Sequence, residues 1–144
     1  MSDSHHFVDI GVARVDTGRH GRCGFPEVIF GPGKTPGDMV AIARHIVERH
    51  GVVLATRVDE AQAAAMREAF PAARFHERAR AVTVEERPLP KLGGAVAVVC
   101  AGTSDLPVAE EASVTLSVFG NRVESFFDVG VAGIHRLLAV RDQI

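Results

Sequence analysis

The apolar positions in the first half of the chain follow a helical period over one long segment. Thr35 is a good N-cap and Pro36 fits the first helical position, with Asp38 three residues after the cap. An apolar stripe follows and ends at Gly51. The residues of this stripe are Met39, Val40, Ile42, Ala43, Ile46 and Val47. The pattern predicts an amphipathic helix that begins after a strand-to-helix turn.

The next residues predict a strand, a second helix and a charged edge strand. The run VVLAT at residues 52–56 is typical of a buried strand. Asp59 and Gln62 form a capping signal for a helix that stops before Pro71. Residues 74–85 alternate in the manner of a strand but carry many charges, so we expect one edge strand there.

The last third repeats one pattern twice: a buried strand, then a glycine-containing turn, then a helix. The first copy has a strand from Ala95 and a helix at residues 104–119, and the second has a strand at residues 123–129 and a helix from Gly133. Alternating strands and helices predict parallel βαβ units. We therefore expect an α/β fold.

The chain divides at RPLPKLGG, residues 87–94. Its two prolines cannot donate backbone hydrogen bonds to a sheet, and its two glycines favour turns and irregular backbone, as is typical of a linker. We predict a small N-terminal α/β domain at residues 1–86 and a second α/β domain at residues 95–144. Two parallel strands leave open edges and uncovered apolar faces, so the second domain is expected to be incomplete and to associate with further chain.

Composition excludes several classes of protein. A net charge of −2 provides no basic field for nucleic acid, and the longest apolar runs are far too short to span a membrane. The N-terminus lacks the basic start and apolar core of a secretory signal, so a cytoplasmic protein is expected. Cys23 and Cys100 form no disulfide framework or zinc motif. Six histidines have no metal-ligand spacing and are interpreted as surface residues: His5, His6, His20, His45, His50 and His76.

The two breaks in the last third are candidate ligand sites, because ligands of open α/β sheets bind beyond the carboxyl ends of the strands. In the first, Gly102 permits a tight turn, Thr103 and Ser104 are possible helix caps, and Asp105 follows. An anion site and an ordinary capped turn remain equally open there.

The second break runs from Asp128 to the adjacent His135 and Arg136, a possible acid or base beside a permanent cation. A solvated helix start explains this pair about as well as an anion site does. Because two such breaks on adjacent strands would share one crevice, we favour a site for an anionic substrate.

The turn GPGKT at residues 31–35 is similar to a phosphate loop, but Val28 stands where that loop needs a glycine. A strand-to-helix turn explains the glycines and Thr35, and leaves Lys34 free to face an anion. Glu27 and Lys34 flank this turn and Arg57 ends the next strand. We expect these three side chains to cluster near the carboxyl ends of their strands as a possible site of the N-terminal domain.

Three runs resemble the LarB family, the pyridinium-3,5-biscarboxylic acid mononucleotide synthases of nickel-pincer cofactor synthesis, which are related to the phosphoribosylaminoimidazole carboxylases. They are DTGRHGRCGFPEVIFGPGKT at residues 16–35, AGTSDLPVAEEA at 101–112 and DVGVAGIHRLL at 128–138. The resemblance implies that residues from about 95 begin a carboxylase-like, flavodoxin-like three-layer parallel-sheet domain, of which this chain holds the first half.

The resemblance also implies an activity. Such enzymes carboxylate the nicotinate ring of nicotinic acid adenine dinucleotide with CO2 or bicarbonate and release AMP, with Mg²⁺ as a cofactor and as homo-oligomers. Gly102, Thr103, Ser104 and Asp105 would line the nucleotide crevice, together with Asp128, and His135 and Arg136 would hold phosphate and ribose. The segment with the family's nucleophilic cysteine has no counterpart here, so the catalytic residue is unknown and the chain alone is expected to be inactive.

Two alternatives remain. One is a phosphoribosylaminoimidazole carboxylase or mutase of purine synthesis. The presence of an N-terminal domain argues against this alternative. The other is a non-catalytic remnant that binds nucleotide or assembles with a partner.

Overall fold

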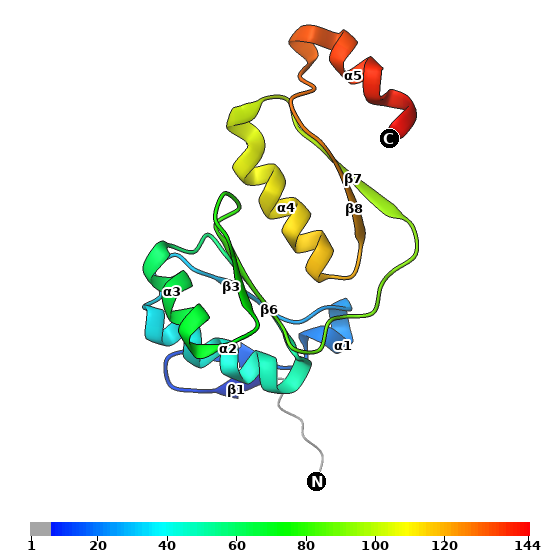
Figure 1. The fold of residues 1–144 in the computed structure, drawn as a ribbon. Coiled ribbons are helices and arrows are strands. Elements are labelled where there is room, and N and C mark those ends of the chain that lie inside the picture. The colour runs from blue at the N-terminus through cyan, green and yellow to red at the C-terminus, as the bar shows by residue number, and fades with distance from the viewer. Residues whose placement is uncertain (1–6) are drawn as a thin grey trace. The chain divides into compact units, whose positions relative to one another are not determined.

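A computed structural model describes residues 7–144, which form two compact units (Figure 1). The first unit comprises residues 7–76 together with Arg80–Pro88, and the second comprises Glu77–Ala79 together with Leu89–Ile144. Both units combine helices with sheets, and the predicted α/β class is confirmed. The six N-terminal residues, which include His5 and His6, lie outside the described part.

The first unit holds a four-stranded sheet, two long helices and a short hairpin. Its elements are β1 (Phe7–Asp9), β2 (Arg14–Asp16), α1 (Arg19–Cys23), β3 (Val28–Phe30), α2 (Pro36–His50), β4 (Val52–Thr56), α3 (Glu60–Ala69), β5 (Ala73–His76) and β6 (Ala81–Glu85). The sheet order is β3-β4-β6-β5, while β1 and β2 pair separately as an antiparallel hairpin. β3 and β4 are parallel, and β6 is antiparallel to both of its neighbours. β3 is therefore an edge strand.

The helix boundaries follow the local signals in the sequence. The Thr35 hydroxyl accepts from the Asp38 backbone N–H and the Asp38 carboxylate accepts from the Thr35 N–H, which forms a reciprocal capping box at α2. Gly51 ends α2 in the left-handed conformation. The predicted stripe faces the core, since Met39, Ile42, Ala43, Ile46 and Val47 are buried. α2 and α3 contact each other and the sheet.

The charged segment at residues 74–85 is not the single edge strand that we predicted. It forms two strands, β5 and β6, joined by a tight turn in which Arg80 adopts a positive φ of 49°. β5 is the edge strand, whereas β6 lies between β4 and β5 with Ala81–Val84 buried. Most of the charges that suggested an edge belong to β5 and to the turn, whereas β6 is largely apolar and carries a charge only at its last residue, Glu85.

The second unit contains a two-stranded parallel sheet with a helix packed against it. Its elements are β7 (Ala95–Val99), the 3-10 turn η1 (Thr103–Asp105), α4 (Leu106–Val118), β8 (Arg122–Phe126), η2 (Val131–Gly133), α5 (Ile134–Val140) and η3 (Arg141–Gln143). β7 pairs with β8 in parallel and α4 packs against both strands, forming one βαβ unit (Figure 1). The two predicted strands and both predicted helices of this region are confirmed, with boundaries shifted by a few residues.

None of the helices in residues 7–144 has the length and apolar character needed to cross a bilayer.

Candidate functional site

The ends of β7 and β8 are held together beyond their ladder. The Cys100 N–H donates to Phe126 O at 3.1 Å, the Val129 N–H to Cys100 O at 3.1 Å, and the Gly130 N–H to Ala101 O at 2.8 Å. A side chain at Gly130 does not fit, because its Cβ would lie 2.8 Å from the Ala101 carbonyl oxygen. The two predicted breaks therefore begin side by side at one end of the sheet.

The first break is closed by Asp105. Its carboxylate accepts from the Gly102 N–H at 2.9 Å, and the Asp105 N–H donates to Gly102 O at 3.0 Å. Thr103 and Ser104 are exposed, and neither provides the cap that we predicted from their hydroxyls. The Asp105 carboxylate instead reaches back three residues and accepts from the Gly102 N–H, which closes the turn. The hydroxyl groups are thus left at the surface of the turn.

The second break gathers Asp128, His135 and Arg136. Asp128 has a positive φ of 59°, and both its backbone carbonyl and its Oδ1 accept from Arg136 Nη1, at 3.0 and 2.9 Å. The His135 ring and the Arg136 side chain fold back over Gly133, where a Cβ would meet His135 Cε1 at 3.0 Å and Arg136 Nε at 3.1 Å. This turn therefore brings the three predicted residues together and fixes one edge of the guanidinium.

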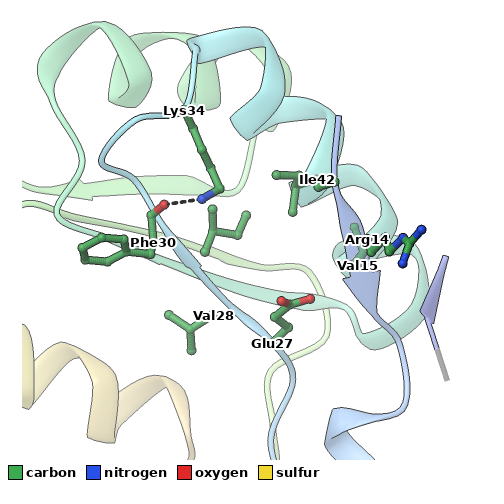
Figure 2. Close-up of a pocket in the computed structure, with 9 residues that line it drawn as sticks. Arg14, Val15, Glu27, Val28, Phe30, Lys34 and Ile42 are labelled. Atoms are coloured by element: carbon green, nitrogen blue, oxygen red, sulfur yellow. Dashed lines mark hydrogen bonds between the residues drawn. The ribbon is translucent and has the colours of Figure 1, made fainter. Parts of the chain in front are cut away.

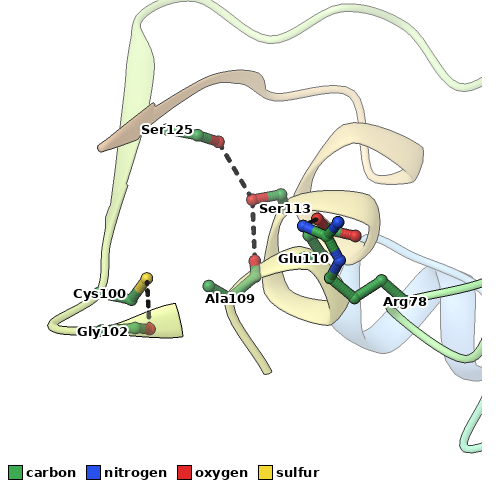
Figure 3. Close-up of polar contacts among 7 residues, drawn as sticks. All are labelled: Arg78, Cys100, Gly102, Ala109, Glu110, Ser113 and Ser125. Carbon is green, nitrogen blue, oxygen red and sulfur yellow. Dashed lines mark hydrogen bonds and ion pairs between the residues drawn. The ribbon is translucent and has the colours of Figure 1, made fainter. Parts of the chain in front are cut away.

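A hollow of about 430 Å³ lies beside the first turn, a size within the range of small-molecule sites. It is lined by β7, by Asp105 and by the first turns of α4. Nearby, Ser113 Oγ donates to Ala109 O at 2.9 Å and lies 3.4 Å from Ser125 Oγ, which links α4 to β8 (Figure 3). The Cys100 thiol makes a weak contact of 3.9 Å with Gly102 O. This cysteine follows the last residue of β7, and its thiol points toward the turn.

A second pocket, the N-terminal pocket, lies between β2, β3 and α2 and has a volume of about 270 Å³ (Figure 2). Glu27 and Lys34 both line it. The Lys34 ammonium donates to Phe30 O at 2.8 Å, and Glu27 Oε2 accepts from the Asp16 N–H at 2.7 Å. Arg14 lies at its exposed rim and forms an ion pair with Asp9 at 3.3 Å.

Only part of the predicted N-terminal cluster forms around this pocket. Lys34 follows β3, but Glu27 precedes it and so lies at the amino end of that strand, not at the carboxyl end as we expected. Both side chains still line one pocket because β3 is only three residues long. Arg57 follows β4 with a positive φ of 55° and is not among the lining residues.

Gln62 is the residue of this region whose structural role the sequence analysis missed. Its side chain is 3% exposed, and its Nε2 donates to Gly31 O at 2.9 Å and to Lys34 O at 2.7 Å. Its Oε1 accepts from the Asp59 N–H at 3.0 Å. The capping pattern marked Gln62 only as a helix-start residue, and no signal in the sequence indicates that its side chain also holds the turn at residues 31–34.

Gly31 is required at this turn by space. A Cβ would lie 2.9 Å from Arg57 O, 3.0 Å from Thr56 O and 3.0 Å from Gln62 Oε1. The Gly31 N–H donates to Thr56 O at 2.9 Å, which fastens the turn to the end of β4. The segment that resembles a phosphate loop is thus a strand-to-helix turn with a tightly packed backbone.

The charged trio at Asp16, Arg19 and Arg22 forms one ion pair. The Arg22 guanidinium donates to Asp16, whose other carboxylate oxygen accepts from the Gly18 N–H at 3.0 Å. Burial raises the pKa of Asp16, but these hydrogen bonds and the charges of Arg22 and Arg19 outweigh it, so that the net pKa lies below 3.8. Asp16 therefore remains an anion beside the N-terminal pocket at neutral pH.

His50 departs from the surface position that we predicted for the histidines. Its Nε2 is buried without a hydrogen-bond partner among the described residues, and its ring centroid lies 5.6 Å from that of His20. Burial and the positive charges of His20, Arg49 and Arg87 lower the pKa of His50 below 6.5. The sequence did not indicate this burial, because His50 ends a helix next to polar residues.

The described residues offer no ready-made metal centre. Within residues 7–144, no group of three or more His, Cys, Asp and Glu side chains is arranged to hold a metal ion. Mg²⁺ commonly relies on phosphate oxygens for part of its coordination.

Two comparisons relate the chain to known proteins. The model of the family described as "LarB/PurE-like N-terminal domain" matches residues 7–87. An uncharacterized protein of Methanocaldococcus jannaschii is 34% identical over 130 residues, which cover 86% of this chain and 51% of that relative. The chain thus spans about half the length of the curated relative that it matches. Because the family model covers more than half of the chain, the chain belongs to the PurE-related LarB family.

Proposed function

We propose that this chain provides the nucleotide-binding part of a carboxylase that acts on nicotinic acid adenine dinucleotide. The full reaction would add CO2 or bicarbonate to the nicotinate ring and hydrolyse the phosphoanhydride with release of AMP. The family membership supports the carboxylase class. The observation that carries the proposal is the turn after β8, in which Asp128 orients Arg136 while His135 folds over the same glycine.

The chemistry of this turn suits a phosphate-bearing ligand. A guanidinium is a permanent cation whose fork of N–H donors matches phosphate oxygens. Asp128 occupies Arg136 Nη1, so the remaining guanidinium nitrogens are the donors for a ligand. The exposed His135 provides a further ring nitrogen at the same place. Gly102, Thr103, Ser104 and Asp105 form the turn after the neighbouring strand β7. The substrate's phosphates would lie between the two turns.

Three further features belong to the same proposal. Any Mg²⁺ would be bound chiefly through substrate phosphate. Bicarbonate or CO2 would be the co-substrate. We propose a homo-oligomer, because large apolar side chains on the second unit are exposed, including Val99 at 44% and Val108 at 61%.

The proposal is tested by calorimetric titration of the 144-residue chain with nicotinic acid adenine dinucleotide. A charge-assisted hydrogen bond contributes roughly 1.5–3 kcal/mol, so Arg136→Ala should weaken binding at least about tenfold. Arg141→Ala is the matched control, since this exposed arginine pairs with the adjacent Asp142, and it should bind as the wild type does.

The same titration separates the alternatives. Tighter binding of aminoimidazole ribonucleotide than of the dinucleotide would overturn the proposal in favour of the purine carboxylase. Failure to bind either nucleotide would also overturn it, as would equal affinities of the wild type and Arg136→Ala.

A further inference from the structure

We propose that the N-terminal pocket is a binding site for a small carboxylate ligand that also carries a hydrogen-bond donor. All residues that line the pocket belong to the first unit, whereas the residues of the proposed nucleotide site belong to the second unit. The inference therefore goes beyond the proposed function and does not depend on it.

The pocket lies along the open edge of a sheet. β3 is an edge strand of the four-stranded sheet, while β2 pairs only with β1. Strand edges present backbone N–H and C=O groups that need partners. Two side chains already supply such partners here: the Glu27 carboxylate binds the Asp16 N–H, and the Lys34 ammonium binds Phe30 O. A ligand carboxylate would accept from the Lys34 ammonium, as Phe30 O does.

The two side chains have opposite charges but are not paired with each other. Both line the pocket, and no ion pair joins Glu27 to Lys34 in the described structure. Figure 2 shows the ammonium beside the end of β3 and the carboxylate at its start. An ammonium has three donors, of which Phe30 O occupies one. A ligand with a carboxylate toward Lys34 and a donor toward Glu27 would satisfy both ends of the pocket.

The turn that carries Lys34 is held in place before any ligand arrives. The buried Gln62 amide binds the carbonyls of Gly31 and Lys34, and Gly31 is packed too tightly to accept a Cβ. Because the backbone on both sides of the ammonium is fixed, binding would order little besides the lysine side chain. The volume of about 270 Å³ restricts the ligand to a compact molecule.

Calorimetric titration with three probes of similar size tests the proposal. 3-Hydroxypropionate has both the carboxylate and the donor, propionate lacks the donor, and 1-propanol lacks the carboxylate. We expect the hydroxy acid to bind at least about fivefold more tightly than either of the other two, since each loses one charge-assisted contact.

Variants assign the two charges. Lys34→Met should weaken binding of the hydroxy acid about tenfold or more, whereas Lys91→Met should leave it unchanged. These are the only two lysines in the chain, and Lys91 is exposed and outside the pocket, which makes it a matched control. Glu27→Gln should reduce the preference for the hydroxy acid over propionate, because the ligand hydroxyl then donates to a neutral amide oxygen and no longer to a carboxylate.

A second measurement locates the ligand. Reductive methylation followed by mass spectrometry reports each lysine separately, and 3-hydroxypropionate should slow the labelling of Lys34 without changing that of Lys91. Equal affinities for all three probes would overturn the proposal, as would binding that survives Lys34→Met in a variant with an unchanged circular dichroism spectrum. Arg136→Ala should not alter any of these results, so this test and that of the nucleotide site fail independently.

Discussion

Replacing Gln62 by leucine should destabilise the first unit by about 2–4 kcal/mol. The side chain is 3% exposed, and its hydrogen bonds to Lys34 and Asp59 are partly buried. Leucine has nearly the same size, and the loss therefore comes from hydrogen bonding and not from a cavity. The Lys34 carbonyl and the Asp59 N–H each lose their Gln62 partner, whereas Gly31 O keeps the Lys34 N–H at 3.1 Å. Both hydrogen bonds are partly buried, so each lost partner costs an amount toward the lower end of roughly 1–3 kcal/mol, partly offset by the greater apolarity of leucine.

Urea unfolding followed by far-ultraviolet circular dichroism measures this loss, because the chain has no Trp or Tyr for fluorescence. Gln143→Leu is the control, since Gln143 is exposed in η3, and it should change stability by less than about 0.5 kcal/mol. Gln62→Glu tests the direction of the bonds. It places an oxygen opposite two carbonyl oxygens and should be at least as destabilising as leucine at pH 7. A Gln62→Leu protein as stable as Gln143→Leu would refute the reasoning.

Two further predictions concern stability. Gly31→Ala should lower the free energy of unfolding by about 1–3 kcal/mol in a urea titration, because its Cβ would press on carbonyl oxygens at 2.9–3.0 Å. Gly21→Ala is the control, since no atom lies within 4 Å of its Cβ, and it should be neutral or slightly stabilising. Equal effects of the two substitutions would contradict the packing argument. Because the pKa of His50 is lowered in the folded state, the unfolded chain binds a proton at a higher pH, and stability should fall as the pH drops below about 6.5. His50→Gln should flatten this pH dependence of stability between pH 7.5 and 5.5. A variant with an unchanged pH profile would show that His50 is not responsible.

The local order of elements was predictable from the sequence because its signals act over a few residues. Thr35, Asp38 and Gly51 fix the ends of α2 through capping contacts three or four residues apart, and the apolar stripe between them has only one face to bury. The strand–turn–helix pattern after residue 95 likewise predicted β7, α4 and β8, since two parallel strands need a helical crossover.

Tertiary structure alone decided which strands are neighbours and which polar groups meet. The segment at residues 74–85 became a hairpin whose second strand is central, because β4 offers it a partner that no local pattern reveals. The role of Gln62 depends on a turn 31 residues earlier in the chain, and the grouping of Glu27 with Lys34 depends on the shortness of β3. The hydrogen bonds between Asp128 and Arg136 depend on the left-handed backbone conformation of Asp128, which no sequence pattern predicts. Each of these contacts joins residues that no helical or strand period relates, so only the folded chain brings them together.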